Sequence, residues 1–329
     1  MQYVNFGQTG MKVSRLCLGT MGFGTPAWRP WVMDESASTP VIHAAIERGI
    51  NFIDLADFYS IGVSEEVVGR AIRHIPRHKL VLASKCLYAM SDDVNDQGLS
   101  RKHIFDAVDA SLRRIGTDYL DLFVIHGFDP STPMEETMRA LDDVVRSGKV
   151  RYIGASTMYA WQFVKMNYLA KVHGWTSFVS MQCQLNAAYR EEEREMIPYC
   201  QHEGLAVTPF SPLARGLLSG NATSLRNKTD QFTTQQYDDQ TSLDIARAVG
   251  QIAENRGVLP SQIALAWVNA RPGVTSTLIG VETIEQLDQN ISALDMVLTP
   301  QELFEIDRCY TPCDVINDYN LNRIPRQPR

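Results

Sequence analysis

The sequence predicts a closed (β/α)8 barrel, the TIM-barrel architecture, from two observations. Eight short apolar segments recur along the chain, and a stretch with helical features follows each of them. Strands that are apolar throughout belong to parallel sheets buried on both faces, and eight strand–helix units are typical of a closed barrel. In addition, Gly19, Gly22 and Gly24 do not have the Gly-x-Gly-x-x-Gly spacing of open dinucleotide-binding sheets. An open doubly wound sheet is therefore the second choice.

The N-terminal third is expected to form a β-hairpin followed by two strand–helix units. Residues 2–7 and 11–14 flank Gln8-Thr9-Gly10, which is a turn signal. Ser38 and Ser64 are placed to cap the first two helices. The predicted strands here are 16–19 and 50–54, the predicted helices are 38–48 and 64–74, and residues 21–36 form an irregular loop.

The same alternation continues to the C-terminus within one domain, residues 1–329. Ser100 and Ser261 are placed to cap helices, and Pro300 to start the last one. Residues 214–240 are rich in Ser, Thr, Asn and Gln and form a long loop, which in compact domains is usually functional or disordered. The remaining strands are 80–84, 120–125, 150–154, 178–181, 205–209 and 277–280, and the remaining helices are 100–115, 133–146, 158–172, 191–203, 241–256, 261–270, 283–293 and 300–309.

Composition restricts the class of protein. The 329 residues are 44% hydrophobic and 21% charged, as in soluble globular proteins. A net charge of −7, with no cluster of Lys and Arg, argues against a nucleic-acid partner. The six scattered cysteines lack zinc-ligand spacing and are expected to be reduced thiols, so no metal site is predicted. Because no signal peptide or apolar run of about 20 residues is present, we expect a cytoplasmic protein that does not enter a membrane.

Four polar side chains are expected to meet at the mouth of the barrel. Asp54, Lys85 and His126 each stand at the C-terminal end of a predicted strand, and Tyr59 lies just beyond the first of them. An ammonium lowers the pKa of a nearby phenol, and a drop of about 3 units corresponds to about 4 kcal/mol. Such a group could protonate an oxygen while a hydride donor attacks the carbon. A structural ion pair between Lys85 and Asp54, or a buried core histidine, are the simpler alternatives for single residues.

These motifs together resemble the aldo-keto reductase superfamily over nearly the whole chain. The similarity is greatest to bacterial and fungal single-chain reductases, which are related to potassium-channel β-subunits. The segments that carry it are Asp54-Leu-Ala-Asp-Phe-Tyr59, Lys85, Asp118-Tyr-Leu-Asp121-Leu-Phe-Val-Ile-His126, Gly154-Ala-Ser156, Met181-Gln182, Arg190-Glu-Glu-Glu-Arg-Glu-Met196, Ser211-Pro-Leu-Ala-Arg-Gly216 and Gly280 through Leu287.

The resemblance implies a catalytic tetrad of Asp54, Tyr59, Lys85 and His126, with Tyr59 as the general acid. It also implies an extended nicotinamide cofactor across the barrel mouth, with its ring stacked on Phe210. The residues implied in cofactor binding are Thr20, Met21, Asp54, Ser156, Gln182, Phe210, Ser211, Leu213, Gly216, Arg226, Gln286, Gln289 and Asn290.

The type of cofactor and the substrate are less sharply indicated. Relatives often carry basic residues where Asn221 and Glu282 stand here, so Arg226 is the local cation expected to bind a 2′-phosphate. We expect NADP(H), with NAD(H) as the alternative. Thr157 replaces an Asn that is frequent in the family, a change expected to be mild. A sizeable or aromatic carbonyl substrate is suggested by possible pocket residues Trp28, Trp31, Tyr88, Met90, Phe128 and 214–240.

Three functions remain open from the sequence. The first is a carbonyl reductase or alcohol dehydrogenase acting on a small molecule, with hydride from C4 of the nicotinamide and a proton from Tyr59. The second is a Schiff-base lyase that uses Lys85 as nucleophile, which a neighbouring Asp54 opposes by raising the amine pKa. The third is a cofactor-binding regulatory subunit with little turnover. The chain could be a monomer or a homo-oligomer.

Overall fold

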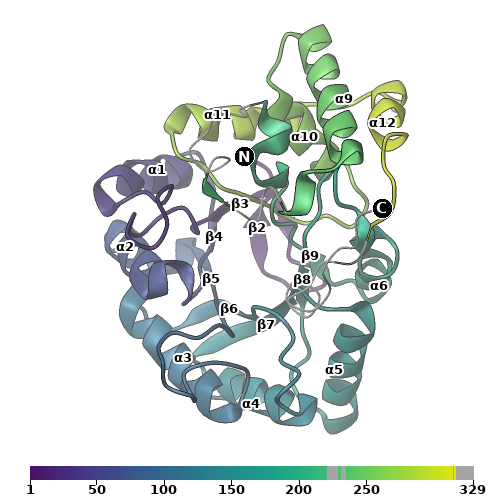
Figure 1. The fold of residues 1–329 in the computed structure, drawn as a ribbon. Helices are drawn as coiled ribbons and strands as arrows, with labels where there is room; N and C mark the ends of the chain where they lie inside the picture. Colours follow the sequence, from purple (N-terminus) through teal and green to yellow (C-terminus); the bar gives the residue numbers. More distant parts are fainter. Residues whose placement is uncertain (221–228, 231–234, 314, 316–329) are drawn as a thin grey trace.

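A ring of parallel strands forms the centre of the molecule (Figure 1). The computed structural model describes residues 1–220, 229–230, 235–313 and 315. Their eight-stranded sheet has the order β10-β3-β4-β5-β6-β7-β8-β9. The Leu278 N–H donates to the Pro209 carbonyl at 2.9 Å and so links the two outer strands, which confirms the predicted (β/α)8 barrel. The strands are β3 Leu16–Gly19, β4 Phe52–Asp54, β5 Val81–Cys86, β6 Leu120–Ile125, β7 Val150–Ser156, β8 Ser180–Gln182, β9 Ala206–Val207 and β10 Thr277–Ile279.

The predicted hairpin closes the N-terminal end of the barrel. Strands β1 Tyr3–Asn5 and β2 Lys12–Ser14 pair antiparallel. The ring of Phe6 packs edge-on against Phe52 with centroids 5.6 Å apart, and both belong to the small apolar core inside the barrel. Because this end is plugged, the C-terminal ends of the strands form the only mouth among the described residues.

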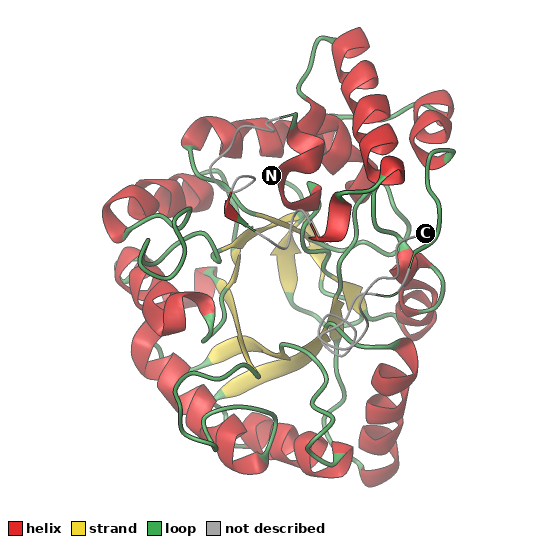
Figure 2. Ribbon diagram, viewed as in Figure 1, coloured by secondary structure: helices red, strands yellow, loops and turns green. Residues whose placement is uncertain are grey.

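Helices surround the strands on the outside (Figure 2). Their apolar faces form a large core with the outer faces of the strands. The additional helices near the C-terminus were predicted, and α9 and α12 stand outside the ring in Figure 2. The helices are α1 Glu35–Glu47, α2 Val63–Ile72, α3 Arg101–Ile115, α4 Met134–Arg146, α5 Ala160–His173, α6 Met196–Glu203, α9 Gln240–Arg256, α10 Pro260–Asn269, α11 Ile284–Ser292 and α12 Pro300–Asp307.

Serine proved an unreliable signal for helix starts. Ser100 caps α3 as predicted, accepting from a backbone N–H at 3.2 Å. The other three predictions were wrong: Asp34 caps α1 and places Ser38 inside the helix, and Ser64 and Ser261 also lie inside α2 and α10. The Ser38 hydroxyl donates instead to the carbonyl of the N-cap residue Asp34, and the Ser64 hydroxyl donates to the Thr20 carbonyl in the β3–α1 loop. These two hydroxyls thus bond to backbone carbonyls and do not cap a helix.

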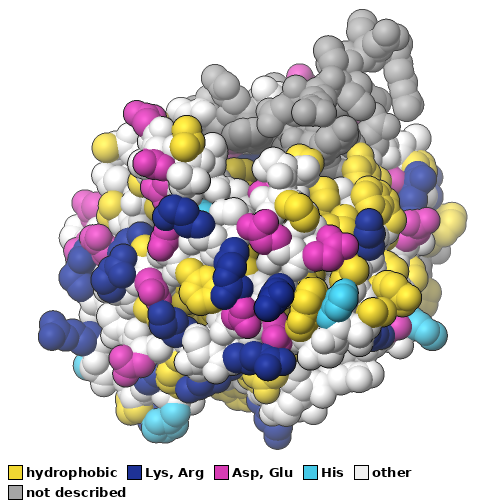
Figure 3. Space-filling model, turned by 90° about the horizontal axis from the view of Figure 1, so that it is seen from below, with side chains coloured by type: hydrophobic (Ala, Val, Ile, Leu, Met, Phe, Trp, Pro, Cys, Tyr) yellow, Lys and Arg dark blue, Asp and Glu magenta, His cyan; other side chains and the backbone are white. Residues whose placement is uncertain are grey.

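The outer surface mixes charges of both signs with scattered apolar side chains, as Figure 3 shows for one face. Paired charges on α3 and α4 explain part of this pattern: Arg101 Nη1 lies 2.5 Å from Asp143, and Lys102 Nζ lies 2.7 Å from Asp106. No helix in the described part of the chain has the length and apolar character that a membrane span requires.

Candidate functional site

A cavity of about 740 Å³ opens at the C-terminal ends of the strands. It brings together most of the residues predicted for catalysis and for cofactor binding, although they come from segments far apart in the sequence. The predicted residues that line it are Met21, Asp54, Tyr59, His126, Ser156, Gln182, Phe210, Ser211, Leu213, Gly216, Gln286, Gln289 and Asn290.

Two of the predicted residues that the structure describes are not in the cavity wall, and a third lies outside the described residues. Lys85 is fully buried behind Asp54 and Tyr59. Thr20 is also fully buried, and its hydroxyl donates to the Asp54 carbonyl at 3.0 Å, so it supports the strand end from behind. Arg226 lies outside the described residues.

Lys85 holds the polar centre of the site together. Its ammonium donates to Asp54 Oδ2 at 2.6 Å, to the Leu55 carbonyl at 2.8 Å and to the Tyr59 hydroxyl at 3.2 Å. An ammonium has three N–H donors, so all of them are used. Adjacent strands β4 and β5 bring the charges together, while left-handed Ser60 (φ 52°) turns the chain behind Tyr59. Backbone strain of this kind is concentrated at functional sites.

The pKa of Tyr59 differs from the sequence-based prediction, whereas Lys85 is charged as expected. Burial lowers the pKa of Lys85, but Asp54 and Tyr59 overcome that effect and the pKa is raised overall. Burial raises the pKa of Tyr59, and this effect exceeds the opposing one of Lys85. The predicted lowering of the Tyr59 pKa was therefore wrong for this state, because burial of the phenol outweighs the ammonium and Asp54 adds a smaller contribution in the same direction as burial. The phenol is protonated at neutral pH.

His126 lies beside the phenol at the cavity wall. The ring centroids of His126 and Tyr59 are 5.8 Å apart, and the Tyr88 ring also packs against the imidazole with a centroid distance of 4.9 Å. Burial, with a smaller contribution from Lys85, holds the pKa of His126 well below its usual value. The imidazole is therefore neutral and can offer one N–H as a hydrogen-bond donor. Because it lines the cavity, His126 is not simply a core histidine.

Gln182, Ser156 and Thr157 lie at the same cavity as Asp54, and hydrogen bonds or backbone conformation fix their side chains. Gln182 Nε2 donates to Asp54 Oδ1 at 2.9 Å, which fixes the orientation of the amide and leaves its oxygen as an acceptor. The Ser156 and Thr157 hydroxyls are 3.0 Å apart. Thr157 has a φ of 46°, a left-handed conformation that asparagine tolerates and β-branched residues resist. Threonine at this position therefore carries backbone strain at the cavity.

A strained turn after β9 forms another wall. Ser211 (φ 53°), Arg215 (φ 55°) and Gly216 (φ 105°) are all left-handed and line the cavity. Arg215 was quoted in a motif but not assigned to the site by sequence reasoning, and its Nη1 lies 3.1 Å from Asp230. Arg29 was also missed, and its guanidinium lies over the Trp28 ring at 4.3 Å from the centroid.

Residues 15–311 match the Aldo/keto reductase family. The chain belongs to this family. It is 40% identical to the versiconal hemiacetal acetate reductase of Aspergillus parasiticus, over 95% of this chain and 98% of the relative. It is 42% identical to the aldo-keto reductase AMT2 of Alternaria alternata (94% and 91% covered). It is also 40% identical to a putative aryl-alcohol dehydrogenase of Schizosaccharomyces pombe (95% and 97% covered).

This aldo/keto reductase is thus a nicotinamide-dependent oxidoreductase that acts on the carbonyl groups of small molecules. The structure argues against the lyase alternative, because the amine of Lys85 is protonated, fully buried and engaged in three contacts. A Schiff base needs a free amine with access to the substrate.

Glu192 is a further residue of the reductase cavity that the sequence did not single out. It is 8% exposed and stands in the 3-10 turn η3, Glu191–Glu193. Burial, followed by the charge of Glu191, raises the pKa of Glu192 from 4.5 to about 8. In the sequence it is one of three consecutive glutamates, a pattern more typical of a solvated surface than of a cavity wall.

This shift predicts a pH-dependent effect of Glu192→Gln on stability. The folded pKa lies above the unfolded one, so the stability given by the protonated carboxyl is present below about pH 4.5 and is lost as the pH rises to about 8. The glutamine variant should therefore match the wild type near pH 4.5 and exceed it increasingly above, by up to about 1.4 kcal/mol per pH unit. Urea unfolding of both proteins between pH 5 and 9 measures the difference, and parallel curves would contradict the shift.

Proposed function

We propose that the reductase transfers hydride from NADPH to aromatic or similarly bulky aldehydes and ketones, with Tyr59 as proton donor. The observation that carries the proposal is the contact of the Lys85 ammonium with Asp54 and Tyr59, beside His126, at the wall of the cavity. Carbonyl reduction needs a general acid, a cation that stabilises its conjugate base and a neutral hydrogen-bond donor, and Tyr59, Lys85 and His126 can fill these roles.

The cavity suits an extended dinucleotide. At one end, Gln182 offers a fixed amide oxygen and Ser156 a hydroxyl for a carboxamide, and Phe210 offers an aromatic face for the ring. In the middle, the left-handed turn at residues 211–216 is the kind of backbone that forms anion-binding concavities, which suits a diphosphate. At the other end, the side chains of α11 supply polar groups for the adenosine: Gln286, Gln289 and Asn290.

The nicotinamide, when bound, supplies the hydride that adds to the carbonyl carbon. The chain's own residues handle the charge on the oxygen. Tyr59 donates its proton to that oxygen, and the Lys85 ammonium, 3.2 Å away, stabilises the tyrosinate that results. Asp54 keeps the ammonium in place. Neutral His126 donates a hydrogen bond to the same oxygen and polarises the carbonyl without adding a charge.

The preference for NADPH over NADH is proposed from the family resemblance and from one cation, Arg226, that could bind the 2′-phosphate. Glu282 lines the cavity near α11, and its backbone N–H donates to Gln286 Oε1 at 2.8 Å. An acidic side chain there disfavours a 2′-phosphate unless a cation offsets it. We assign that role to Arg226, because Arg29 and Arg215, the cations among the described lining residues, are both within reach of Asp230.

The substrate side of the cavity is aromatic. Trp28 packs against Phe58 with centroids 5.7 Å apart, Phe58 against Tyr88 at 4.9 Å, and Tyr88 against His126 at 4.9 Å. Trp31 lines the cavity as well. This continuous wall leads to the proposed proton donor. The sequence did not indicate Phe58.

Two other predicted pocket residues are placed elsewhere. Phe128 and Met90 are not in the cavity wall. Phe128 lies against Trp161, with ring centroids 6.4 Å apart. The relative named as a putative aryl-alcohol dehydrogenase supports an aromatic substrate class for this chain too.

The test is a comparison of matched aldehydes with both cofactors. Aromatic stacking contributes about 0.5–1.5 kcal/mol per contact, so we expect kcat/KM for benzaldehydes to exceed that for linear aldehydes of equal reactivity by about tenfold. NADPH should support faster turnover than NADH at equal concentration. Oxidation of the reduced cofactor is followed by absorbance. Equal kcat/KM for both classes would refute the aromatic site, and no turnover of any carbonyl would refute the function.

A further inference from the structure

The hydroxyl of Tyr237 holds two buried amides at the edge of the cavity. It accepts from Gln184 Nε2 at 2.7 Å and from Asn186 Nδ2 at 2.9 Å. The phenol ring is 4% exposed, and both amide residues are buried. Neither Tyr237 nor Asn186 lines the cavity, whereas Gln184 does. Tyr237 stands just before α9, so this contact joins the end of the long loop to the chain that follows β8.

Asn186 connects Tyr237 to the strained turn after β9 through a second hydrogen bond. The same Nδ2 group that donates to Tyr237 donates to the Ser211 carbonyl at 3.0 Å, and Asn186 Oδ1 accepts from the Ala188 N–H at 2.9 Å. The Asn186 side chain is thereby fixed at both ends. The Ser211 carbonyl also accepts from the Ala214 N–H at 3.0 Å, so two bonds hold it in the left-handed conformation.

We propose that Tyr237 is a positioning residue for cofactor binding, which sets the geometry of the turn at residues 211–216 through Asn186. The inference rests on the proposed function, in which this turn holds the cofactor diphosphate. Without the Tyr237 oxygen, the Asn186 amide loses one of the two acceptors that orient its NH2 group, and the Ser211 carbonyl is held less firmly. A turn with left-handed residues relaxes readily when such a contact is lost, because the conformation is strained.

The substitution Tyr237→Phe removes only the hydroxyl. We expect the dissociation constant of NADPH to rise about tenfold, which corresponds to 1.4 kcal/mol. The KM for NADPH should rise in parallel, while kcat at saturating cofactor stays within about twofold, because Asp54, Tyr59, Lys85 and His126 are untouched. Quenching of tryptophan fluorescence by NADPH reports the dissociation constant, since Trp28 and Trp31 line the cavity.

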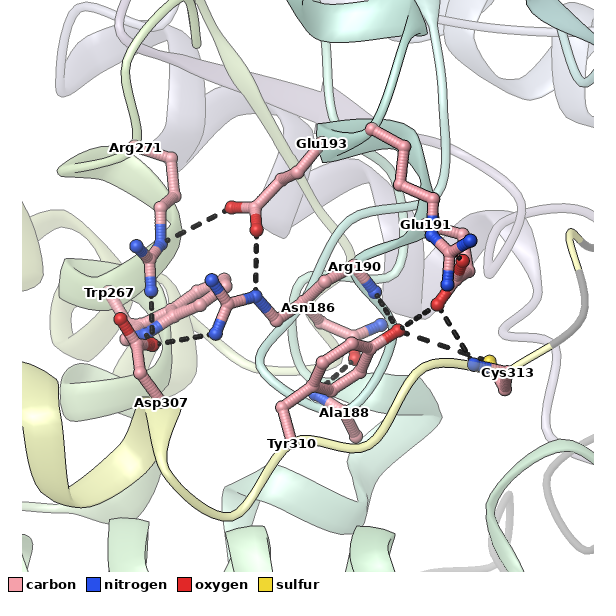
Figure 4. A network of polar contacts seen from close by, with 11 residues as sticks. Asn186, Ala188, Arg190, Glu191, Glu193, Trp267, Arg271, Asp307, Tyr310 and Cys313 are labelled. Atoms are coloured by element: carbon pink, nitrogen blue, oxygen red, sulfur yellow. Dashed lines mark hydrogen bonds and ion pairs between the residues drawn. The ribbon is translucent and has the colours of Figure 1, made fainter.

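Tyr310→Phe is the matched control. The Tyr310 hydroxyl contacts the same 186–191 segment, where it accepts from the Arg190 N–H at 3.1 Å and donates to Glu191 at 2.6 Å (Figure 4). Tyr310 does not line the cavity. The Tyr310 hydroxyl also has a longer contact of 4.0 Å with Cys313 Sγ, so Tyr310→Phe removes at least as many contacts as Tyr237→Phe, and its melting temperature should fall at least as far. Only the Tyr237 variant should bind NADPH more weakly.

A double-mutant cycle with Asn186→Ala tests the route of the effect. If Tyr237 acts through Asn186, adding Tyr237→Phe to the alanine variant changes the NADPH dissociation constant by less than about twofold. Additive losses, or equal dissociation constants for the two Phe variants, would overturn the inference. A wild-type protein that binds neither NADPH nor NADH would instead overturn the proposed function, so the two failures are distinguishable.

Discussion

Tyr59→Phe is expected to lower kcat for aldehyde reduction by about 10³-fold, within the range of 10² to 10⁴ that general acid catalysis contributes. The variant keeps the ring that packs against His126 and loses only the hydroxyl that Lys85 contacts at 3.2 Å. Because burial keeps the phenol protonated, the wild-type hydroxyl can serve as donor over the whole neutral range. Single-turnover reduction of an aromatic aldehyde at saturating NADPH measures the loss.

Binding of NADPH is the internal control for this variant. In the proposed mechanism the Tyr59 hydroxyl serves the substrate oxygen and not the diphosphate, so the dissociation constant of NADPH should change by less than about threefold. A variant with more than a tenth of the wild-type kcat would exclude Tyr59 as the proton donor. Water or His126 would then have to supply the proton.

The fold could be predicted because the sequence repeats one pattern. The strands are mostly apolar, and polar residues stand at the C-terminal ends of β4 and β5, which predicts that Asp54 and Lys85 lie at the same mouth. The resemblance to the family added the cofactor residues. These parts of the site depend on chain order and strand polarity, which are local properties of the sequence.

Other parts of the site depend on contacts between distant segments. Glu192 looks like a surface residue among three glutamates, and only the packing of η3 beneath the cavity buries it. Tyr237 lies in a polar loop, and its partner Asn186 is 51 residues earlier in the chain. The sign of the Tyr59 pKa shift was also beyond reach, because it requires the balance of burial and Asp54 against the ammonium. No single segment carries this information.

Asp54→Asn should destabilise the folded protein by about 3–5 kcal/mol, the cost of leaving a buried charge without its partner. Lys85 is fully buried, and its bond to Asp54 Oδ2 is 2.6 Å long. An asparagine can accept from only one of its two present donors. Either its NH2 faces the Lys85 ammonium, or it faces Gln182 Nε2 and the Gln182 amide must turn round. The second orientation is favoured, because it keeps the acceptor oxygen towards the ammonium, and in it the variant loses the fixed Gln182 amide oxygen proposed for the nicotinamide carboxamide.

The pH dependence gives this prediction a definite sign. In the variant, burial without a counter-charge depresses the folded pKa of Lys85 below its unfolded value of about 10.4, and neutralising the amine relieves the cost. The stability difference from the wild type should thus be largest near pH 7 and shrink towards pH 10. Urea unfolding at both pH values measures it, and a difference that is constant or grows with pH would contradict the uncompensated charge.

A second substitution separates stability from catalysis. Buried ion pairs can often be replaced by apolar residues without loss of stability, whereas removal of one partner is costly. Asp54→Asn combined with Lys85→Met should therefore recover most of the lost free energy of unfolding and yet have little or no reductase activity. Because Tyr59 is intact in the double variant, its inactivity would show that the phenol needs the ammonium beside it to release its proton. A double variant with restored turnover would mean that the pair serves only to hold the fold.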